Sequence, residues 1–432
     1  MEDERTARDR KIIVLAVVLS LLLVSSCFAI PYLLSSNGSS SSRDEKDTVA
    51  SSLGSEVKSE LEQVLLDSDS YVDAQDIVED NYVDEVDGEA LISAGARGIR
   101  RIAAEGSDEE ALVNRGITAM IDSLDDPFSS YMDEETLALL DTQLSGSFFG
   151  IGVAMQTVKN EIRVQSVLEG TPAQEVGLQE GDIVKEVDGM DVTGMELNEV
   201  VAIIRGEEGT TVTLGVVRPP SSDIREFDIV RGRIEIPVIE TELKEGNIGY
   251  LLLTDWTQDV DKKLSQALAD LREQGAESLI IDLRLNPGGY MEPSIRAADM
   301  FLRDGTIVSS KGRVIGTNQE YEADDEVQWD LPVVILVDRG TASSSEIFAA
   351  ALSENGRAVL VGETTFGKGS IQKIFRQDDG TGLRLTIARY YTPDGISIDD
   401  EGIAPDIFVK NSVVGEEDLQ LEKAIEAAGS GL

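Results

Sequence analysis

The pattern of apolar and polar residues changes several times along this 432-residue chain. An almost unbroken apolar run covers residues 12–34, and a polar stretch rich in serine and glycine follows at 36–54. From 55 to 143, apolar residues recur at spacings of three and four, which predicts a helical region. From 144 to 233, short alternating segments are separated by glycine turns, which predicts a β-rich module with two short helices.

Residues 234–410 alternate between apolar runs of strand length and amphipathic runs of helix length. The expected buried strands are IGYLLL, SLIIDLR, PVVILVD and AVLVGE, and the expected helices are DVDKKLSQALADLREQ, MEPSIRAADMFL and SSEIFAAALSEN. This alternation is typical of an α/β domain with a largely parallel sheet, in which ligands bind at the carboxyl ends of the strands. The glycine-containing turns NPGGY and RGTA lie at two such ends. Residues 411–432 are interpreted as a C-terminal tail.

The apolar run at 12–34 is long enough to cross a bilayer, so residues 1–35 are interpreted as a cytoplasmic tip with a transmembrane anchor. Arg8, Arg10 and Lys11 stand just before the run, which favours a cytoplasmic N-terminus and places the bulk of the chain on the other side. Residues 36–54 are then a flexible linker. An alternative stays open, because LVSSC resembles a bacterial lipoprotein cleavage box with Cys27 as the lipidated residue.

Composition excludes several classes of function. Asp and Glu number 82 against 37 Lys and Arg, and a net charge of -45 opposes binding to nucleic acid phosphates. Cys27 is the one cysteine, and the chain has no histidine, so a Ser-His-Asp triad, an intrachain disulfide and metal sites built on His or Cys are excluded. No calcium-loop pattern is present either. We therefore expect neither a metal nor a cofactor.

Three consecutive serines stand in DRGTASSSEIFAA, residues 338–350. Ser343 and Glu346 form an S-x-x-E pattern that a helix cap explains without any catalysis. A strand, a tight turn and a serine at a helix start also describe how hydrolases expose a nucleophile. Without histidine, the base that activates such a serine would be a lysine whose pKa burial lowers. Lys368 in the glycine-lined segment FGKG is the candidate.

The same segment contains a nucleotide-binding pattern that fails on two counts. Residues 362–368 match G-x-x-x-x-G-K, but Gly369 stands where the magnesium-binding Ser or Thr belongs. The following residues, SIQKIF, alternate like a strand, whereas a phosphate loop opens a helix. Nucleotide binding is therefore rejected.

Six blocks in order, LDDPFSSYM, FFGIGVAM, DLRLNPGG, GTASSSEIFAAAL, GETTFGKGSIQ and GLRLTIARYYTPDGISIDDEGIAPDI, resemble the carboxyl-terminal processing, or tail-specific, serine proteases. The resemblance covers nearly everything from Leu61 to Val409. It implies a PDZ domain at 144–233 and a protease core at 234–410 with a crotonase-like or Clp-protease-like α/β fold. It also implies peptide-bond hydrolysis by a Ser-Lys dyad, with Ser343 as nucleophile, Lys368 as base and Gln372 orienting the lysine.

The resemblance also implies where the oxyanion of the reaction binds. The N–H of Ser344 would be one donor, and a glycine N–H of the NPGG turn the other, with Gly288 and Gly289 both open. Ser345 and Glu346 are expected to support the turn or cap the helix.

The β-rich module resembles a PDZ domain, which binds an extended peptide as an added strand and holds its terminal carboxylate with backbone N–H groups. The implied peptide-binding residues are Phe149, Gly150, Ile151 and Gly152 of the loop, and Leu197 and Val201 beside the groove, with Val200 and Ile204 as groove or core residues. Arg205 is assigned a regulatory role, relaying peptide binding to the dyad.

These inferences predict a single-pass protease of the bacterial cell membrane, with its catalytic part on the extracytoplasmic side. Its substrates would be proteins or peptides with apolar free C-termini. The resemblance allows a homodimer, although the long stretch RRIAAEGSDEEALVNRGITAM leaves open whether the helical region would make it. Two rivals are an inert PDZ scaffold that only binds peptides and a hydrolase of non-peptide esters or amides.

Overall fold

The computed structural model describes residues 55–145, 147–324, 326–411 and 418–430. These residues form two compact units, which are described separately: one contains residues up to 145 and from 237 onward, and the other contains 147–236. The predicted anchor at 12–34 lies outside the described residues. Within those ranges, no helix combines the length and the apolarity needed to cross a membrane.

The larger unit is built around a six-stranded sheet with the order β10-β11-β12-β15-β16-β19. Its strands are β10 (Ile239–Lys244), β11 (Ile248–Leu253), β12 (Ser278–Asp282), β15 (Val333–Val337), β16 (Ala358–Gly362) and β19 (Ile407–Phe408). Only β10 runs antiparallel to its neighbour in this sheet. Every residue of β12 and β15 is buried, as expected for parallel strands covered on both faces. The α/β core predicted from the alternating pattern is therefore confirmed.

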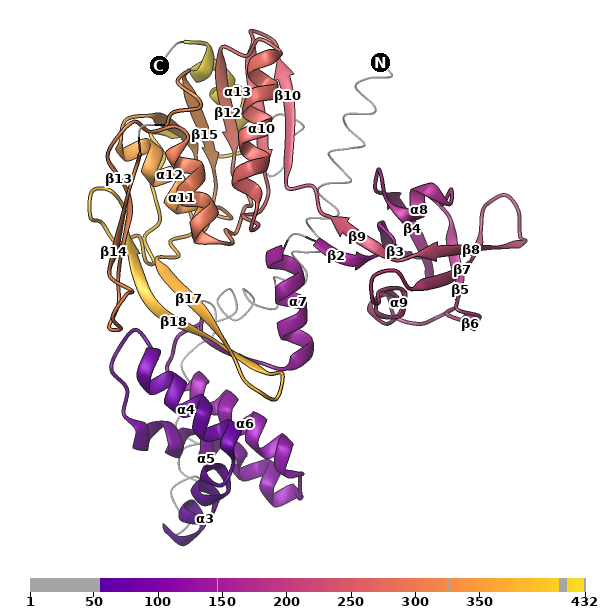
Figure 1. Ribbon diagram of the computed structural model, residues 1–432, viewed down its shortest axis with the longest axis vertical. Helices are drawn as coiled ribbons and strands as arrows, with labels where there is room; N and C mark the ends of the chain where they lie inside the picture. Colours follow the sequence, from indigo (N-terminus) through magenta and orange to yellow (C-terminus); the bar gives the residue numbers. More distant parts are fainter. Residues whose placement is uncertain (1–54, 146, 325, 412–417, 431–432) are drawn as a thin grey trace. The chain divides into compact units, whose positions relative to one another are not determined.

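Helices cover both faces of this sheet (Figure 1). The covering helices are α10 (Val260–Glu273), α11 (Met291–Asp299) and α12 (Ser344–Glu354) on one face, and α13 (Leu419–Gly429) on the other. Side chains of a strand alternate between the two layers, so Leu279 and Ile281 pack toward α10, α11 and α12, while Ile280 packs toward α13.

The C-terminal helix corrects one part of the sequence interpretation. The sequence predicts only a tail at 411–432, whereas α13 packs against the sheet. Three small buried residues, Ala424, Ala427 and Ala428, face strands β12, β15 and β16 and let the helix lie close to them. The short apolar stripe of alanines gave little hydrophobic signal in the sequence, although it completes the core.

A second, antiparallel sheet belongs to the same unit. Its strands are β1 (Ser130–Met132), β13 (Thr306–Lys311), β14 (Gln319–Glu322), β17 (Ser370–Arg376) and β18 (Gly382–Tyr391). The helical region before it contains α3 (Ser55–Leu66), α4 (Asp69–Asn81), α5 (Gly88–Glu105), α6 (Glu109–Asp122) and α7 (Glu134–Ser145). The core of this region includes Leu383 and Leu385, so the predicted helices pack directly onto β18.

The smaller unit is a β-rich module with a six-stranded sheet, in which β3-β4-β5-β7-β8 lie in this order and β6 pairs with β5, and a two-stranded sheet of β2 and β9. Its elements are β2 (Ser147–Gly150), β3 (Val153–Val158), β4 (Glu161–Val167), α8 (Pro172–Glu175), β5 (Ile183–Val187), β6 (Met190–Asp191), α9 (Leu197–Ile204), β7 (Thr211–Val217), β8 (Ile224–Val230) and β9 (Gly232–Glu235). Strand β3 lies at the edge of the sheet, and helix α9 packs beside it. An edge strand next to a helix is the arrangement that accepts an added peptide strand.

Candidate active site

Ser343 is the one member of the serine triplet that is not fully buried. It stands between β15 and α12 with φ 55° and ψ -118°, a conformation that side-chain-bearing residues rarely adopt. The hydroxyl of Ser344 donates to the Gly289 carbonyl at 3.0 Å. Ser345 accepts from the Trp256 indole at 2.9 Å and donates to a backbone carbonyl. Two hydroxyls therefore serve the packing, and only Ser343 is presented at the surface of the turn.

The turn before Ser343 is fixed to the loop that follows β12. The Ala342 N–H donates to the Asn286 carbonyl at 3.0 Å, and the Thr341 hydroxyl donates to the Leu283 carbonyl at 2.8 Å. These bonds between neighbouring loops hold the strained backbone of Ser343 in place. Strain of this kind persists only where the surrounding structure supports it, and it is concentrated at functional sites.

Glu346 connects the serine turn to the lysine segment. Its fully buried carboxylate accepts from the N–H groups of Ser343 at 2.7 Å, Lys368 at 3.0 Å and Gly367 at 2.7 Å, and from the Thr365 hydroxyl at 2.5 Å. Burial raises the pKa of this carboxyl, and the four hydrogen bonds act in the opposite direction. The sequence predicted a supporting or capping residue here, but not a single group that binds both halves of the dyad.

Tyr390 provides a second connection between Ser343 and Lys368. Its buried hydroxyl bonds to the Ser343 carbonyl at 3.2 Å and to the Lys368 carbonyl. Burial raises the pKa of this phenol well above its usual value, so the hydroxyl keeps its proton and remains a donor. The structure therefore brings the backbones of Ser343 and Lys368 together, although 25 residues separate them in the sequence.

The surroundings of Lys368 favour its neutral form. Burial lowers the pKa of the ammonium to about 8, and the nearby charge of Arg384 lowers it as well, while Glu346 and Asp126 oppose the shift. The nitrogen lies 5.0 Å from the centre of the Phe128 ring. With a pKa of about 8, about a tenth of the lysine is neutral at pH 7 and able to accept a proton.

The sequence indicated no role for the residues around the lysine nitrogen. The Phe128 carbonyl accepts from Arg384 at 2.9 Å, and the Ser129 hydroxyl accepts from the Thr386 N–H at 3.0 Å. The loop of the DDPFSS block is thus held against β18 beside the lysine. The motif itself was visible in the sequence, but its position against Lys368 depends on how the helical region packs onto β18.

The structure distinguishes between Gly288 and Gly289 as the second N–H donor of the proposed oxyanion site. The Gly288 N–H already donates to the Asn286 side chain at 3.0 Å. Gly289 forms an isolated β-bridge with Trp256, in which the Trp256 N–H donates to the Gly288 carbonyl and the Tyr290 N–H donates to the Trp256 carbonyl. This bridge leaves the Gly289 N–H without an acceptor in the described ranges. Gly289 is therefore the better donor.

Gly288 has a different role, because its backbone packs directly against the nucleophile. A Cβ on this residue would lie 2.8 Å from the Ser343 Cβ and 3.1 Å from the Ser344 nitrogen, the other predicted donor. Its φ of 101° also favours glycine. The NPGG turn and the start of α12 therefore lie side by side.

Gln372 does not make the contact that the resemblance implies. Its amide nitrogen donates to the Ser370 hydroxyl at 2.9 Å and to the Thr386 hydroxyl at 3.2 Å. Among the residues described, we find no hydrogen bond between Gln372 and Lys368. Its role in orienting the lysine stays a prediction.

In the β-rich module, the predicted peptide-binding residues divide into exposed and buried groups. Phe149 is 44% exposed, whereas Ile151 is buried in the core. Gly152 has φ 83°, and a Cβ there would lie 2.3 Å from Thr171, so the loop requires glycine at this position. Leu197 and Val201 are half-buried one helical turn apart on α9.

The remaining predicted groove positions, Val200 and Ile204, are fully buried and pack the core. Arg205 follows α9, and its guanidinium lies 5.0 Å from the ring centre of Phe148, next to the loop. Within the described chain, its Nε has no hydrogen-bond partner. Burial without a carboxylate partner lowers the pKa of Arg205 and leaves its charge available to a ligand.

No cluster of His, Cys, Asp or Glu among the described residues is placed to hold a metal ion.

Three segments of the chain are similar to known protein families. Residues 247–409 match peptidase family S41, residues 138–217 match the PDZ domain, and residues 99–136 match the N-terminal domain of the activating protease CtpB.

The chain is 39% identical to the carboxy-terminal processing protease CtpA of Bacillus subtilis over 301 residues, which cover 70% of this chain and 64%, less than two thirds, of that protein. It is 35% identical to the carboxyl-terminal-processing protease of Synechocystis sp. over 328 residues, which cover 73% of this chain and 77% of that protein. Among solved structures, a photosystem II D1 C-terminal processing protease aligns with 28% identity and a TM-score of 0.49, over 85% of this chain and 97% of its own.

Proposed function

The chain belongs to peptidase family S41, the C-terminal processing serine peptidases with a PDZ domain, and we propose that it is an endopeptidase with a Ser343–Lys368 dyad. The observation that supports the dyad most directly is the Glu346 carboxylate, which accepts hydrogen bonds from the backbone N–H groups of both residues. The lowered pKa of Lys368 supplies the second requirement, a neutral base near physiological pH.

In the proposed reaction, neutral Lys368 takes the proton of the Ser343 hydroxyl while Oγ attacks the peptide carbonyl carbon. The carbonyl electrons move to oxygen, and the N–H groups of Gly289 and Ser344 stabilise the resulting oxyanion. When the tetrahedral intermediate collapses, the Lys368 ammonium protonates the leaving amine. Water, deprotonated by Lys368, then hydrolyses the Ser343 ester and restores the free enzyme.

We propose that the PDZ domain selects substrates by an apolar free C-terminus. The edge strand β3 offers backbone groups for an added strand, and Leu197 and Val201 of α9 offer half-buried apolar surface beside it. Backbone N–H groups of residues 149–152, the end of β2 and the two residues after it, would hold the terminal carboxylate. The net charge of -45 does not oppose this, because surface charges beyond about 10 Å are screened at physiological salt.

We also propose that residues 12–34 anchor the chain in the cell membrane, with the catalytic part on the extracytoplasmic side. The apolar length of this run and the basic residues before it support the proposal. Retention in membranes after alkaline extraction, by both the natural chain and Cys27→Ser, would support an uncleaved span. Loss of retention in Cys27→Ser would instead indicate lipidation.

The activity is tested with the full chain in a mild detergent, a protein substrate with an apolar free C-terminus, and mass spectrometry of the products. Cleavage that Ser343→Ala and Lys368→Ala abolish, and that amidation of the substrate C-terminus slows, is the expected result. If the wild type and both variants bind the substrate equally and none of them cleaves it, the chain is a peptide-binding scaffold and the proposed peptidase activity is wrong. Light scattering on the same sample measures whether the helical region forms a homodimer, which stays a prediction.

A further inference from the structure

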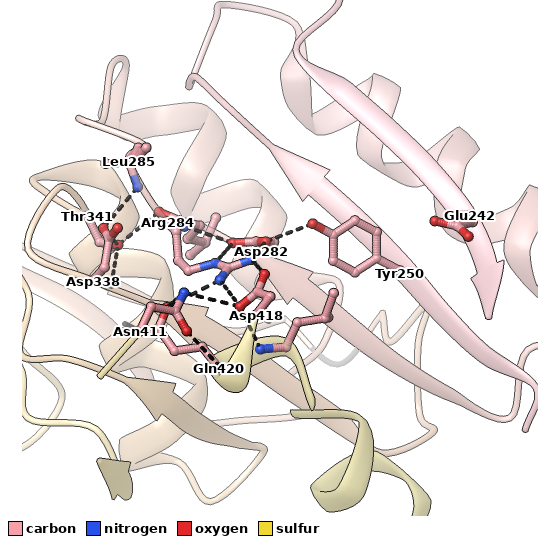
Figure 2. Close-up of polar contacts among 12 residues, drawn as sticks. Glu242, Tyr250, Asp282, Arg284, Leu285, Asp338, Thr341, Asn411, Asp418 and Gln420 are labelled. Atoms are coloured by element: carbon pink, nitrogen blue, oxygen red, sulfur yellow. Dashed lines mark hydrogen bonds and ion pairs between the residues drawn. The ribbon is translucent and has the colours of Figure 1, made fainter. Parts of the chain in front are cut away.

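An ion-pair cluster lies at the carboxyl end of β12, directly before the NPGG turn, with Asp282 buried, Arg284 mostly buried and the Asp418 side chain 39% exposed (Figure 2). Arg284 lies at its centre, between the carboxylates of Asp282 and Asp418. Its guanidinium donates to Asp282 at 2.9 and 2.6 Å and to Asp418 at 2.8 and 2.9 Å. The Arg284 side chain is 15% exposed, and two bidentate pairs on one guanidinium fix its position from both sides.

The second carboxylate comes from the C-terminal helix. Asp418 caps α13 by accepting from the Leu421 N–H at 3.1 Å, and it also accepts from Asn411 at 3.1 Å. Burial alone would raise the pKa of Asp418, but Arg284 holds it below its usual value, so the carboxylate is ionised at neutral pH. Gln420, in the first turn of α13, accepts from Arg284 at 3.2 Å as well.

The first carboxylate is fixed by the sheet. The Tyr250 hydroxyl on β11 donates to Asp282 at 2.7 Å, as Figure 2 shows. Burial, followed by the charge of Asp282, raises the pKa of this phenol and keeps it protonated as a donor. This hydrogen bond ties Asp282 to β11 independently of Arg284.

The chain after Arg284 enters the turn in a strained conformation. Leu285 has φ 59°, which is rare for a leucine, and its N–H donates to Asp338 at 2.9 Å. Three residues later the chain packs against Ser343 through Gly288. The Trp256 bridge holds the backbone on both sides of Gly289, and the chain that enters the turn is held by two further anchors, Asp338 on one side and the Arg284 ion pair on the other.

We propose that Asp418, acting through Arg284, is a positioning residue for the oxyanion turn at 286–289, so that the C-terminal helix takes part in the catalytic step. The inference rests on the proposed peptidase function. Oxyanion donors act only when they are preorganised, and a misplacement of about 1 Å can cost about 100-fold in rate. With an uncharged partner at 418, Arg284 would keep only one of its two ionic anchors, and the turn would lose part of its support.

The test compares Asp418→Asn with Asp330→Asn in the full chain. Asp330 forms an exposed ion pair with Arg272 of α10, so Asp330→Asn removes an Arg–Asp pair elsewhere in the same unit. We expect Asp418→Asn to lower kcat about 10- to 100-fold with KM within about 2-fold of wild type. The inhibition constant of a peptide aldehyde, whose adduct places an oxyanion in the same site, should rise by the same factor. Asp330→Asn should change neither quantity.

Two further variants keep the result independent of folding. Asp418→Glu retains the negative charge and should keep most of the wild-type kcat. Arg284→Lys retains a positive charge but cannot make bidentate contacts to both carboxylates, so its kcat should fall as in Asp418→Asn. Thermal melting measures how much of each sample is folded at the assay temperature. The inference is overturned if folded Asp418→Asn keeps the wild-type kcat and aldehyde affinity, or if Asp418→Glu is as defective as Asp418→Asn. Absence of cleavage by wild type would overturn the proposed function and this inference together.

Discussion

The backbone N–H groups of Ser343 and Lys368 donate to the same oxygen, Oε2 of Glu346, at 2.7 and 3.0 Å. One carboxylate at the start of α12 therefore sets the separation between the nucleophile's turn and the base's segment. Because Glu346 is fully buried, water cannot replace these hydrogen bonds if the carboxylate is lost.

Substituting Glu346 by glutamine should damage both activity and stability. The amide NH₂ would face N–H groups that need an acceptor, and each unpaired buried donor costs about 1–3 kcal/mol. We expect kcat/KM to fall by at least about 100-fold and the melting temperature to drop. The exposed Glu273→Gln is the matched control. A Glu346→Gln protein with wild-type labelling by a fluorophosphonate would show that the shared carboxylate is not needed.

The acidic limb of the profile of kcat/KM against pH should follow the deprotonation of Lys368. Because the base must be neutral, kcat/KM should rise with pH and level off above about 8, the pKa that burial gives the lysine. Removing the nearby positive charge in Arg384→Gln favours the ammonium form, so the limb should move to higher pH and activity at pH 7 should fall. Arg389→Gln, on the same strand but paired with Asp84, should leave the limb in place. An unchanged limb in Arg384→Gln would contradict this electrostatic role.

Ionisation of Asp255 should offset part of the gain in activity that deprotonation of Lys368 gives as pH rises above neutrality. Burial raises the pKa of its carboxyl to about 7, and Oδ1 lies 3.0 Å from where a Cβ on Gly289 would stand. Above that pKa, a negative charge beside the oxyanion site opposes the charge that forms on the substrate oxygen. The ratio of kcat/KM for Asp255→Asn over wild type should therefore increase as pH passes 7. A ratio that stays constant from pH 6 to 9 would exclude the effect.

Arg205 should matter only when the substrate has a free C-terminus. Its half-buried side chain places the guanidinium over the Phe148 ring, beside the segment proposed to hold the substrate carboxylate, so Arg205→Ala should weaken the response to the substrate tail. We expect the ratio of cleavage rates for free and amidated substrates to fall toward one, with the rate on the amidated substrate unchanged. Arg225→Ala, an exposed arginine on β8, serves as control. Normal preference for the free C-terminus in Arg205→Ala would remove its regulatory role.

The elements of the α/β core could be predicted because their signal is local. The run VVILV is apolar at every position and SLIID at its three central positions, which is typical of parallel strands buried on both faces. The amphipathic segments between them predicted α10, α11 and α12 for the same reason. The Ser343–Lys368 dyad is what the family resemblance implies, and it stays a prediction. The absence of histidine agrees with it, since a serine nucleophile then requires another base.

What surrounds the dyad was decided by the tertiary structure. Phe128 reaches Lys368 only because the helical region packs onto β18, and the Gly289 N–H was distinguished from that of Gly288 by the hydrogen bond that Gly288 makes to the Asn286 side chain. Asp418 was assigned to a tail, yet it meets Arg284 across 134 residues of sequence. Such contacts depend on the packing of distant elements rather than on local periodicity. The sequence therefore indicated which residues to propose for the chemistry, and the fold determined which groups shift the pKa of Lys368 and hold the two segments in place.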